Sequence, residues 1–552
     1  MNPYQEPGED GHHTPVLIVG GSLVGLSTSL FLGRLGVPHV LVERHSGTSV
    51  HPRGRGNNVR TMELYRVAGV RQRIEEAASV LSGNNGILQT PRLAGEAGEW
   101  LFREIDPGGG LARLSPAAWC LCSQNDLEPV LVESAAALGG DLRFSTELMS
   151  VDQDSDGVTA HLKSRETGEH TTIRADYLVA ADGPRSPVRE RLGIARGGAG
   201  DLFHNVSITF TSRGLADVVG DRRFVVCYLT DPDADGALLP VDNRERWVFH
   251  APWHPEDGET LEEFTDERCV AHIRRAVGVP DLDVEITGRA PWHAAERVAE
   301  RYADGRVFLA GDSAHEMSPT GAFGSNTGIQ DAHNLAWKLA AVLGGWAGPG
   351  LLRSYDAERR PVAEATSARA SARSVEHSHP GYTPGPAAGG AGGRNGGILD
   401  VVLGHRYPHG AVLGADPSTP AVPEGLRLTG EPGSRAPHLW LDRDGTRVST
   451  LDLYERSLVL LSAADGAGAW HEAALDVAGE LAVPLDAYRI GDGPDAELVP
   501  EGDTDWSGTH GVTRDGAVLV RPDGFVAWRS EAAVADPAAT LREVLAVLLD
   551  RR

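Results

Sequence analysis

The chain has 552 residues, enough for two or three domains, and 41% of them are hydrophobic, so large cores are expected. A formal net charge of −26 argues against nucleic acid or an anionic membrane as a partner, because either would repel an acidic surface. Four cysteines are too few for a disulfide framework, and no apolar run is long enough to span a membrane. We expect a cytoplasmic protein, and the polar residues 1–13 predict a disordered tail.

After this tail the sequence predicts a strand, a tight turn and a helix. Residues 16–19 are apolar, which is typical of a buried parallel strand, and apolar residues recur at helical spacing from 23 to 35. A glycine turn followed by the free amides of a helix start suits the diphosphate of a dinucleotide. The residues predicted to contact it are Gly20, Ser22, Leu23, Val24 and Gly25.

Two further features bear on this interpretation. A second strand, residues 37–42, ends on Glu43, whose carboxylate could accept both hydroxyls of an adenosine ribose. Ser22 replaces the middle glycine of the G-x-G-x-x-G fingerprint, which weakens the motif although a small hydroxyl residue can still fit. The alternative is an ordinary βαβ crossover with a glycine turn.

The middle of the chain predicts a second domain rich in strands. A buried strand at 177–181 ends in the acidic turn Asp182-Gly183, and residues 203–251 contain several further strands. With a helix at 261–277 these strands favour an antiparallel sheet in an α+β domain. Four aromatic residues on the strands are candidates for an apolar ligand pocket, with core packing as the alternative for each: Phe224, Tyr228, Trp247 and Trp292.

The C-terminal half first returns to the opening pattern. A buried strand at 307–310 ends at Gly311-Asp312, and a glycine-rich stretch leads into a helix predicted over 329–343. Residues 379–398 are rich in Gly and Pro and predict a linker. Residues 399–552 then alternate strands and helices in an order similar to thioredoxin, but without any cysteine, which excludes thiol redox chemistry there.

Three separated motifs resemble one family. They are Gly20–Gly25 with Glu43, Asp182–Ser186 with Arg189, and Gly311–His315 with Pro319 and Gly321–Asp331. Together they resemble the flavoprotein aromatic hydroxylases, which have a fold like that of para-hydroxybenzoate hydroxylase. The likeness extends over nearly the whole chain and is greatest to the bacterial aromatic polyketide hydroxylases.

The resemblance implies an α/β fold in three parts. These are a Rossmann-like FAD-binding domain, an inserted α+β substrate domain and a C-terminal thioredoxin-like domain over 399–552. The FAD-binding domain would be discontinuous, and it would comprise residues 14–86, 117–195 and 296–378. The substrate domain would comprise 87–116 and 196–295, with its pocket between the sheet and the flavin.

The resemblance also implies roles for polar residues around FAD. Arg44 would lie near the adenine, and Gln124 would touch the FAD linker or ribityl chain, with helix-end capping as its alternative role. Asp312 would accept hydrogen bonds from the ribityl chain or reach the diphosphate through water. Asp182 would act indirectly by fixing the conformation of its loop.

Two segments would adjoin the flavin ring. Residues Pro319, Gly324, Ser325 and Asn326 would lie beside it, because glycine permits close approach of the backbone. Residues 51–56 form a glycine- and arginine-rich loop that resembles the family's mobile arginine loop. Arg53 or Arg55 of this loop could assist movement of flavin or nicotinamide, and a solvated loop arginine is the alternative.

The implied activity is that of an FAD-dependent monooxygenase in antibiotic-type secondary metabolism. It would use NADPH or NADH and O₂ to hydroxylate a polycyclic aromatic polyketide through a flavin C4a-hydroperoxide. The alternatives are a Baeyer–Villiger or ring-remodelling oxygenase of the same fold, and a flavin-dependent reductase or oxidase that inserts no oxygen. We expect no metal and a monomer or homodimer, and these residues assign no catalytic base.

Overall fold

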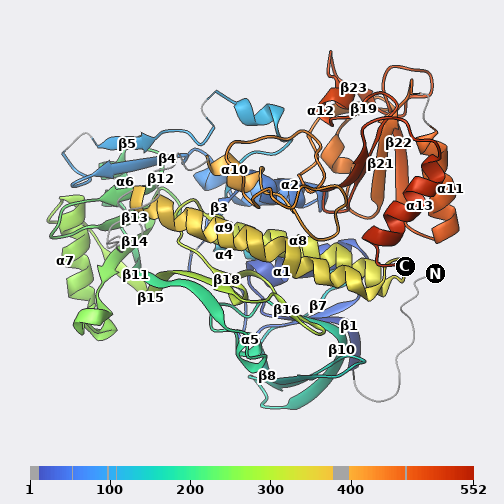
Figure 1. Ribbon diagram of the computed structural model, residues 1–552. Helices are drawn as coiled ribbons and strands as arrows, with labels where there is room; N and C mark the ends of the chain where they lie inside the picture. The colour runs from blue at the N-terminus through green and yellow to red at the C-terminus, as the bar shows by residue number, and fades with distance from the viewer. Residues whose placement is uncertain are drawn as a thin grey trace.

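The computed structural model describes residues 12–551 apart from 53, 96–97, 107, 377–396 and 467–468. Arg53 and nearly all of the predicted linker therefore lie outside the described residues. Figure 1 shows one sheet at the bottom, a second at the left and the C-terminal strands at the upper right. Two long helices, α8 (Phe323–Leu343) and α9 (Ser354–Glu376), cross between them.

The first sheet has the strand order β16-β17-β10-β1-β2-β7, with β8 and β9 attached beyond β10. Neighbouring strands from β17 to β7 run parallel, as expected for buried strands separated by helical crossovers. Helices α1 (Leu23–Arg34), α4 (Gln124–Ala137) and α8 belong to this part of the molecule. The strands are β1 (His12–Val19), β2 (His39–Val42), β7 (Asp141–Arg143), β8 (Thr146–Gln153), β9 (Val158–Ser164), β10 (His170–Ala180), β16 (Ala303–Asp304) and β17 (Val307–Leu309).

Two sequence predictions need correction here. Strand β1 begins at His12, so the predicted disordered tail is wrong for residues 12–13, which pair with β10. Helix α8 begins at Phe323, six residues before the predicted start. Glycine disfavours an isolated helix, but here the glycine-rich turns are packed: a Cβ on Gly328 would lie 2.8 Å from Gly311 Cα.

The second sheet has the strand order β18-β15-β11-β14-β13-β12-β4-β5. All of its pairings are antiparallel except that of β12 with β4, and the amphipathic helix α7 (Asp266–Val277) packs on one face. The strands are β4 (Gly86–Thr90), β5 (Glu99–Phe102), β11 (Arg196–Thr211), β12 (Phe224–Leu229), β13 (Gly236–Pro240), β14 (Arg246–Trp253), β15 (Glu285–Ala299) and β18 (His315–Glu316).

The C-terminal domain contains a four-stranded sheet of order β22-β21-β24-β25. Strands β21 (Leu458–Ala463) and β22 (Leu485–Ile490) are parallel, while β24 (Ala517–Val520) and β25 (Val526–Ser530) continue antiparallel. A smaller sheet of β19 (Trp440–Arg443), β20 (Thr446–Ser449) and β23 (Val499–Pro500) adjoins it. The predicted fold class is confirmed.

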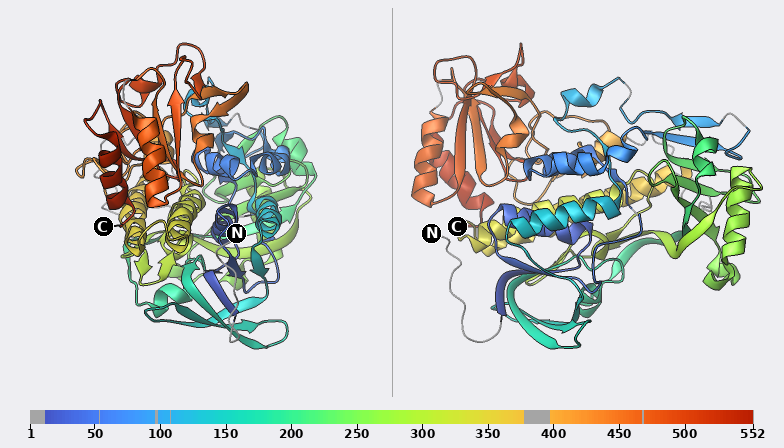
Figure 2. Two further views of the ribbon diagram at one scale, coloured as in Figure 1. Left: turned by 90° about the vertical axis from the view of Figure 1, so that its right-hand side faces the viewer. Right: turned by 180° about the vertical axis from the view of Figure 1, so that it is seen from behind.

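This domain packs onto the FAD-binding part through apolar residues of its helices. Helices α11 (Trp470–Leu481) and α13 (Pro537–Leu548) share a hydrophobic cluster with Trp337 and Ala341 of α8. Figure 2 shows the domain seated beside the layer formed by α8 and α9. The remaining short elements are α2 (Val59–Val67), α3 (Arg71–Ala77), α5 (Pro187–Arg191), α6 (Gly214–Val219), α10 (Ile398–Val402), α12 (Trp506–Thr509), β3 (Gly56–Asn57) and β6 (Cys120–Leu121).

Candidate functional site

Parallel register brings the three sequence motifs to one edge of the first sheet. Val19 at the end of β1 pairs with Ala180 of β10, and Ala180 pairs with Leu309 of β17. Each strand therefore ends at the same level, and the glycine turn, the Asp182 turn and the Gly311-Asp312 turn follow side by side. Ligands of open α/β sheets bind at this carboxyl edge, so the edge is the candidate site.

Glycines allow the elements around this edge to approach closely. Gly20 has φ +107°, and a Cβ there would lie 2.2 Å from the carbonyl oxygen of Ala181. A Cβ on Gly25 would lie 1.8 Å from the carbonyl oxygen of Gly20. Side chains at these positions would force the turn open, so the glycine turn requires both residues.

The start of α1 offers uncapped amides to an anion. Its N-cap is Ser22, but the side chain makes no capping hydrogen bond, and no acidic residue lies in the first turn. The first intrahelical bond at this end is donated by Leu26 N to Ser22 O at 2.9 Å. The amides of Leu23, Val24 and Gly25 are thus left without helical acceptors, as a diphosphate site requires.

Glu43 lies directly beside the glycine turn. Its carboxylate accepts hydrogen bonds from Gly21 N at 2.7 Å and from His45 N at 2.8 Å. The side chain is partly exposed, so its oxygens lie at the edge of the cleft between β1 and β2. Arg44 is exposed on the same loop, where nothing fixes its predicted position near an adenine.

The two acidic motifs differ in exposure. Asp312 is exposed at the sheet edge, whereas burial raises the pKa of Asp182, which accepts a hydrogen bond from Val188 N at 3.2 Å. Arg189 is 2% exposed and donates to Ser313 O at 2.9 Å and to Pro184 O at 3.0 Å. It therefore ties the two acidic turns together.

The start of α8 holds four predicted ring contacts. Pro319 is exposed, and Gly324 faces open space, because a Cβ there would meet no atom within 4 Å. The Asn326 amide is used inside the protein, where it accepts from Asn58 N at 2.9 Å and donates to Gly56 O at 2.7 Å. Asn326 thus fixes the loop before α2 against α8.

Several predicted residues surround one small space at Gly54. A Cβ on Gly54 would lie 3.9 Å from Gln124 Oε1, from Leu23 Cδ1 and from Ser325 Oγ. Gln124 N also donates to Gly54 O at 2.8 Å. The starts of α1, α4 and α8 therefore meet the arginine-rich loop at this point.

Arg55 is the arginine of this loop that the structure describes, and it is not solvated. It is 7% exposed and donates through Nη1 to Pro240 O of β13. Among the described residues its Nε and Nη2 have no hydrogen-bond acceptor, and burial lowers its pKa to about 10. An unpaired buried guanidinium is costly, so Arg55 is a candidate partner for an anionic group.

The two faces of the second sheet separate the predicted pocket residues. Phe224 and Trp247 belong to the hydrophobic cluster beneath α7, and Trp247 Nε1 donates to Ser212 O at 2.9 Å within that face. Their prediction as pocket residues is wrong, since they form part of the core. Side chains alternate along a strand, and the sequence alone did not show which set faces the first domain.

The opposite face is directed toward the arginine-rich loop. His51 of that loop hydrogen-bonds Ser207 Oγ of β11 at 2.8 Å, and Ser207 pairs with His250 of β14. The His250 ring lies 5.4 Å from that of Trp292. Tyr228 belongs to the same row through the β12–β13–β14 register, and burial raises its pKa to about 12.

Comparisons with known proteins agree with this geometry. Residues 13–370 match the FAD binding domain family, and residues 429–551 match the C-terminal domain of aromatic-ring hydroxylases. The chain belongs to the FAD-dependent aromatic-ring hydroxylases. A Streptomyces halstedii hydroxylase, provisionally named for polyketides, is 72% identical over 546 residues, which cover 98% of each protein.

Two other hydroxylase-family proteins are similar over their whole lengths. Tetracenomycin A2 monooxygenase-dioxygenase of Streptomyces glaucescens is 43% identical over 557 residues, covering 97% of each chain. The solved structure of aklavinone-11 hydroxylase with FAD and aklavinone has a TM-score of 0.89 and 39% identity. That match covers 98% of this chain and 100% of the other.

The residues at the sheet edge fit the hydroxylase cofactor FAD. The uncapped amides of α1 suit its diphosphate, and the close-packed glycines leave room beside them. Sequence reasoning missed His51, Ser207, Asn205 and His250 on the substrate side, and Glu128 behind the glycine turn. Their partners lie up to 156 residues away in the chain, so only the alternation along β11 and β14 could have indicated the strand residues.

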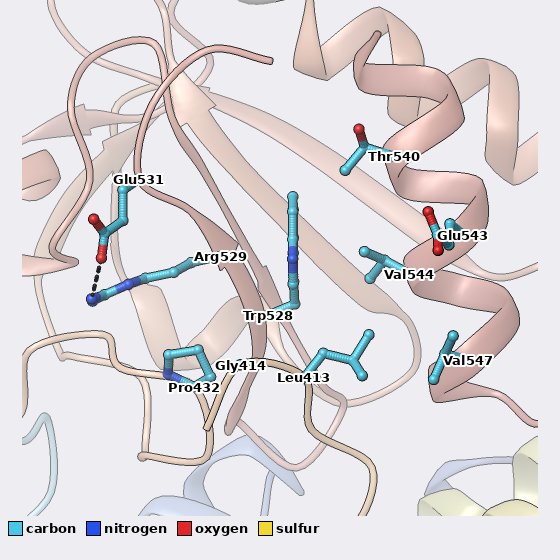
Figure 3. Close-up of a pocket in the computed structure, with 10 residues that line it drawn as sticks. All are labelled: Leu413, Gly414, Pro432, Trp528, Arg529, Glu531, Thr540, Glu543, Val544 and Val547. Atoms are coloured by element: carbon cyan, nitrogen blue, oxygen red, sulfur yellow. Dashed lines mark hydrogen bonds and ion pairs between the residues drawn. The ribbon is translucent and has the colours of Figure 1, made fainter. Parts of the chain in front are cut away.

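Other features lie away from this site. A pocket of about 650 Å³ in the C-terminal domain contains none of the predicted site residues (Figure 3), and its wall includes Trp528, Val544 and the ion pair of Arg529 with Glu531 at 3.0 Å. All four cysteines are free and buried. In the part of the chain that the structure describes, no helix is long and apolar enough to cross a membrane.

Proposed function

We propose that this flavin-dependent monooxygenase hydroxylates a polycyclic aromatic polyketide, with NADPH or NADH and O₂ as co-substrates. The carbon–hydrogen bond of the substrate becomes a carbon–hydroxyl bond, one oxygen atom leaves as water, and the nicotinamide is oxidised. Relatives whose names include aklavinone or tetracenomycin support this substrate class. FAD, when bound, supplies the oxidation–reduction chemistry.

One observation carries the proposal, namely the polar and aromatic face of the second sheet beside the arginine-rich loop. Trp292 and His250 present rings, while the Asn205 Nδ2 group is 1% exposed as a residue and has no acceptor among the described residues. Flat rings and a few polar groups suit a fused aromatic substrate that carries oxygen atoms.

This chain's own residues would bind and orient the substrate. The rings of Trp292 and His250 would pack on its fused rings, and Asn205 would donate a hydrogen bond to one of its oxygens. Arg55 would stabilise an ionised phenol, since a phenolate donates electrons more readily than a phenol does. Burial of this face excludes water and strengthens each of these polar contacts.

The proposal is tested by substrate-dependent oxidation of NAD(P)H. The purified protein is expected to be yellow and to oxidise NADPH or NADH faster with a phenolic polycycle than with the same compound methylated at its hydroxyls. Product mass and nuclear magnetic resonance should show one new hydroxyl group. Ring expansion would support the Baeyer–Villiger alternative, and oxidation of nicotinamide without oxygen in the product would support a reductase or oxidase.

A further inference from the structure

Ser22 stands at the most demanding position of the FAD-binding turn. A serine at a helix N-cap ordinarily turns its hydroxyl oxygen toward the amides of the first turn and accepts a hydrogen bond from one of them. In this family those amides are needed by the diphosphate of FAD. A self-capping serine would therefore compete with the cofactor for the same donors.

The structure shows the Ser22 hydroxyl directed elsewhere. Ser22 Oγ donates to Glu128 Oε1 at 2.6 Å, and Gln124 Nε2 donates to Ser22 Oγ at 2.8 Å. Its backbone has φ −98° and ψ −168°, which suits an N-cap, yet the side chain makes no capping bond. Both the proton and an acceptor site of this hydroxyl are thus engaged away from the helix.

Glu128 is the centre of this arrangement. It lies on α4, is 1% exposed, and receives three donors from segments that are distant in sequence or one helical turn apart. Besides Ser22, these donors are Gln124 Nε2 at 2.7 Å and Ser49 N at 2.7 Å. Three strong hydrogen bonds fix the carboxylate, and through it they fix the loop at Ser49 and the side chain of Gln124.

We propose that Glu128 is a positioning residue for FAD, which holds the Ser22 hydroxyl away from the first turn of α1. The amides of Leu23, Val24 and Gly25 then stay available to the diphosphate. Glu128 thereby compensates for the serine that replaces the middle glycine of the fingerprint. This inference rests on FAD binding and not on the substrate, so a failure of hydroxylation would leave it standing.

The test is a double-mutant cycle on FAD affinity. Apoprotein is titrated with FAD, and the Kd is measured by quenching of flavin fluorescence. Glu128→Ala is expected to raise the Kd about tenfold, because the freed Ser22 hydroxyl can cap the helix. Adding Ser22→Gly removes that hydroxyl and is expected to lower the Kd of the Glu128→Ala protein at least about threefold.

Two further variants separate this account from its competitors. Glu128→Gln keeps an acceptor oxygen for Ser22 and is expected to bind FAD within about threefold of wild type. Glu133→Ala removes an exposed carboxylate of the same helix, which pairs with Arg73, and should leave the Kd unchanged. The proposal is overturned if Glu128→Ala binds FAD normally, if Ser22→Gly gives no rescue, or if Glu128→Gln binds FAD more tightly, as simple charge repulsion would require.

Discussion

At the scale of single residues, the glycine turn makes the sharpest steric demand. Gly25→Ala would place a methyl group 1.8 Å from the Gly20 carbonyl oxygen, so the turn must open and the α1 amides must shift. We expect this variant to purify with much less FAD than wild type, measured as the ratio of absorbance at flavin and protein wavelengths. Gly47→Ala is the control, because a Cβ at Gly47 meets no atom within 4 Å. Normal FAD content in Gly25→Ala would contradict the assignment of this turn.

Arg55 allows stability and activity to be separated at one position. Its guanidinium is buried with two nitrogens unpaired among the described residues, so Arg55→Met removes a desolvated charge at nearly constant volume. Such replacements are often neutral or stabilising, and we expect an equal or higher Tm. The KM for the aromatic substrate is expected to rise about tenfold, because a charged hydrogen bond is lost. A lower Tm with unchanged kinetics would instead show a structural arginine.

At the scale of elements, the two faces of the second sheet predict opposite phenotypes for two tryptophans. Trp247→Ala opens a cavity under α7 and is expected to cost about 3–5 kcal/mol of stability, with KM unchanged in the protein that folds. Trp292→Ala, on the half-buried opposite face, should change stability little and raise KM for the substrate. Thermal unfolding and steady-state kinetics on both variants decide the matter, and exchanged phenotypes would place the pocket under α7.

The same elements show what the sequence could and could not predict. The apolar runs that end at Val19, Ala181 and Ala310 define buried strands, and parallel pairing then brings their motifs to one edge. The start of α8 was placed too late, because helix propensity penalises glycine while the packing of Gly328 on Gly311 requires it. The face of Trp247 was not determined by alternation, because both faces of the sheet are covered by protein. Glu128 was missed because Ser22 lies 106 residues away.

At the scale of the whole molecule, buried ion pairs fasten the C-terminal domain to the FAD-binding part. Arg435, which is fully buried, donates to Glu63 of α2, with Nε to Oε2 at 3.0 Å, and Arg521 binds Glu358 of α9 at 2.7 Å. The nearby Arg435 guanidinium opposes desolvation and holds the pKa of Glu63 below its usual value. The domain without cysteines therefore stabilises the molecule, and we expect removal of residues 399–552 to give poorly soluble protein.

A point variant tests this docking more finely than truncation does. Arg435→Met leaves Glu63 buried without its main partner, and removal of one member of a buried pair costs about 3–5 kcal/mol. We expect a clearly lower Tm and earlier loss of FAD on heating. Arg447→Met, which breaks only the exposed pair with Glu501, should change stability by less than about 1 kcal/mol. Equal effects of the two variants would contradict a stabilising role for the buried pair.

The central claim is that this protein transfers one oxygen atom from O₂ to an aromatic polycycle. Its most direct test is turnover under ¹⁸O₂ in ordinary water, with a phenolic polycyclic substrate and NADPH or NADH, followed by mass spectrometry of the product. The account predicts one ¹⁸O atom in each product molecule, located in a new hydroxyl group. A product that carries no ¹⁸O, although nicotinamide is consumed, would contradict it.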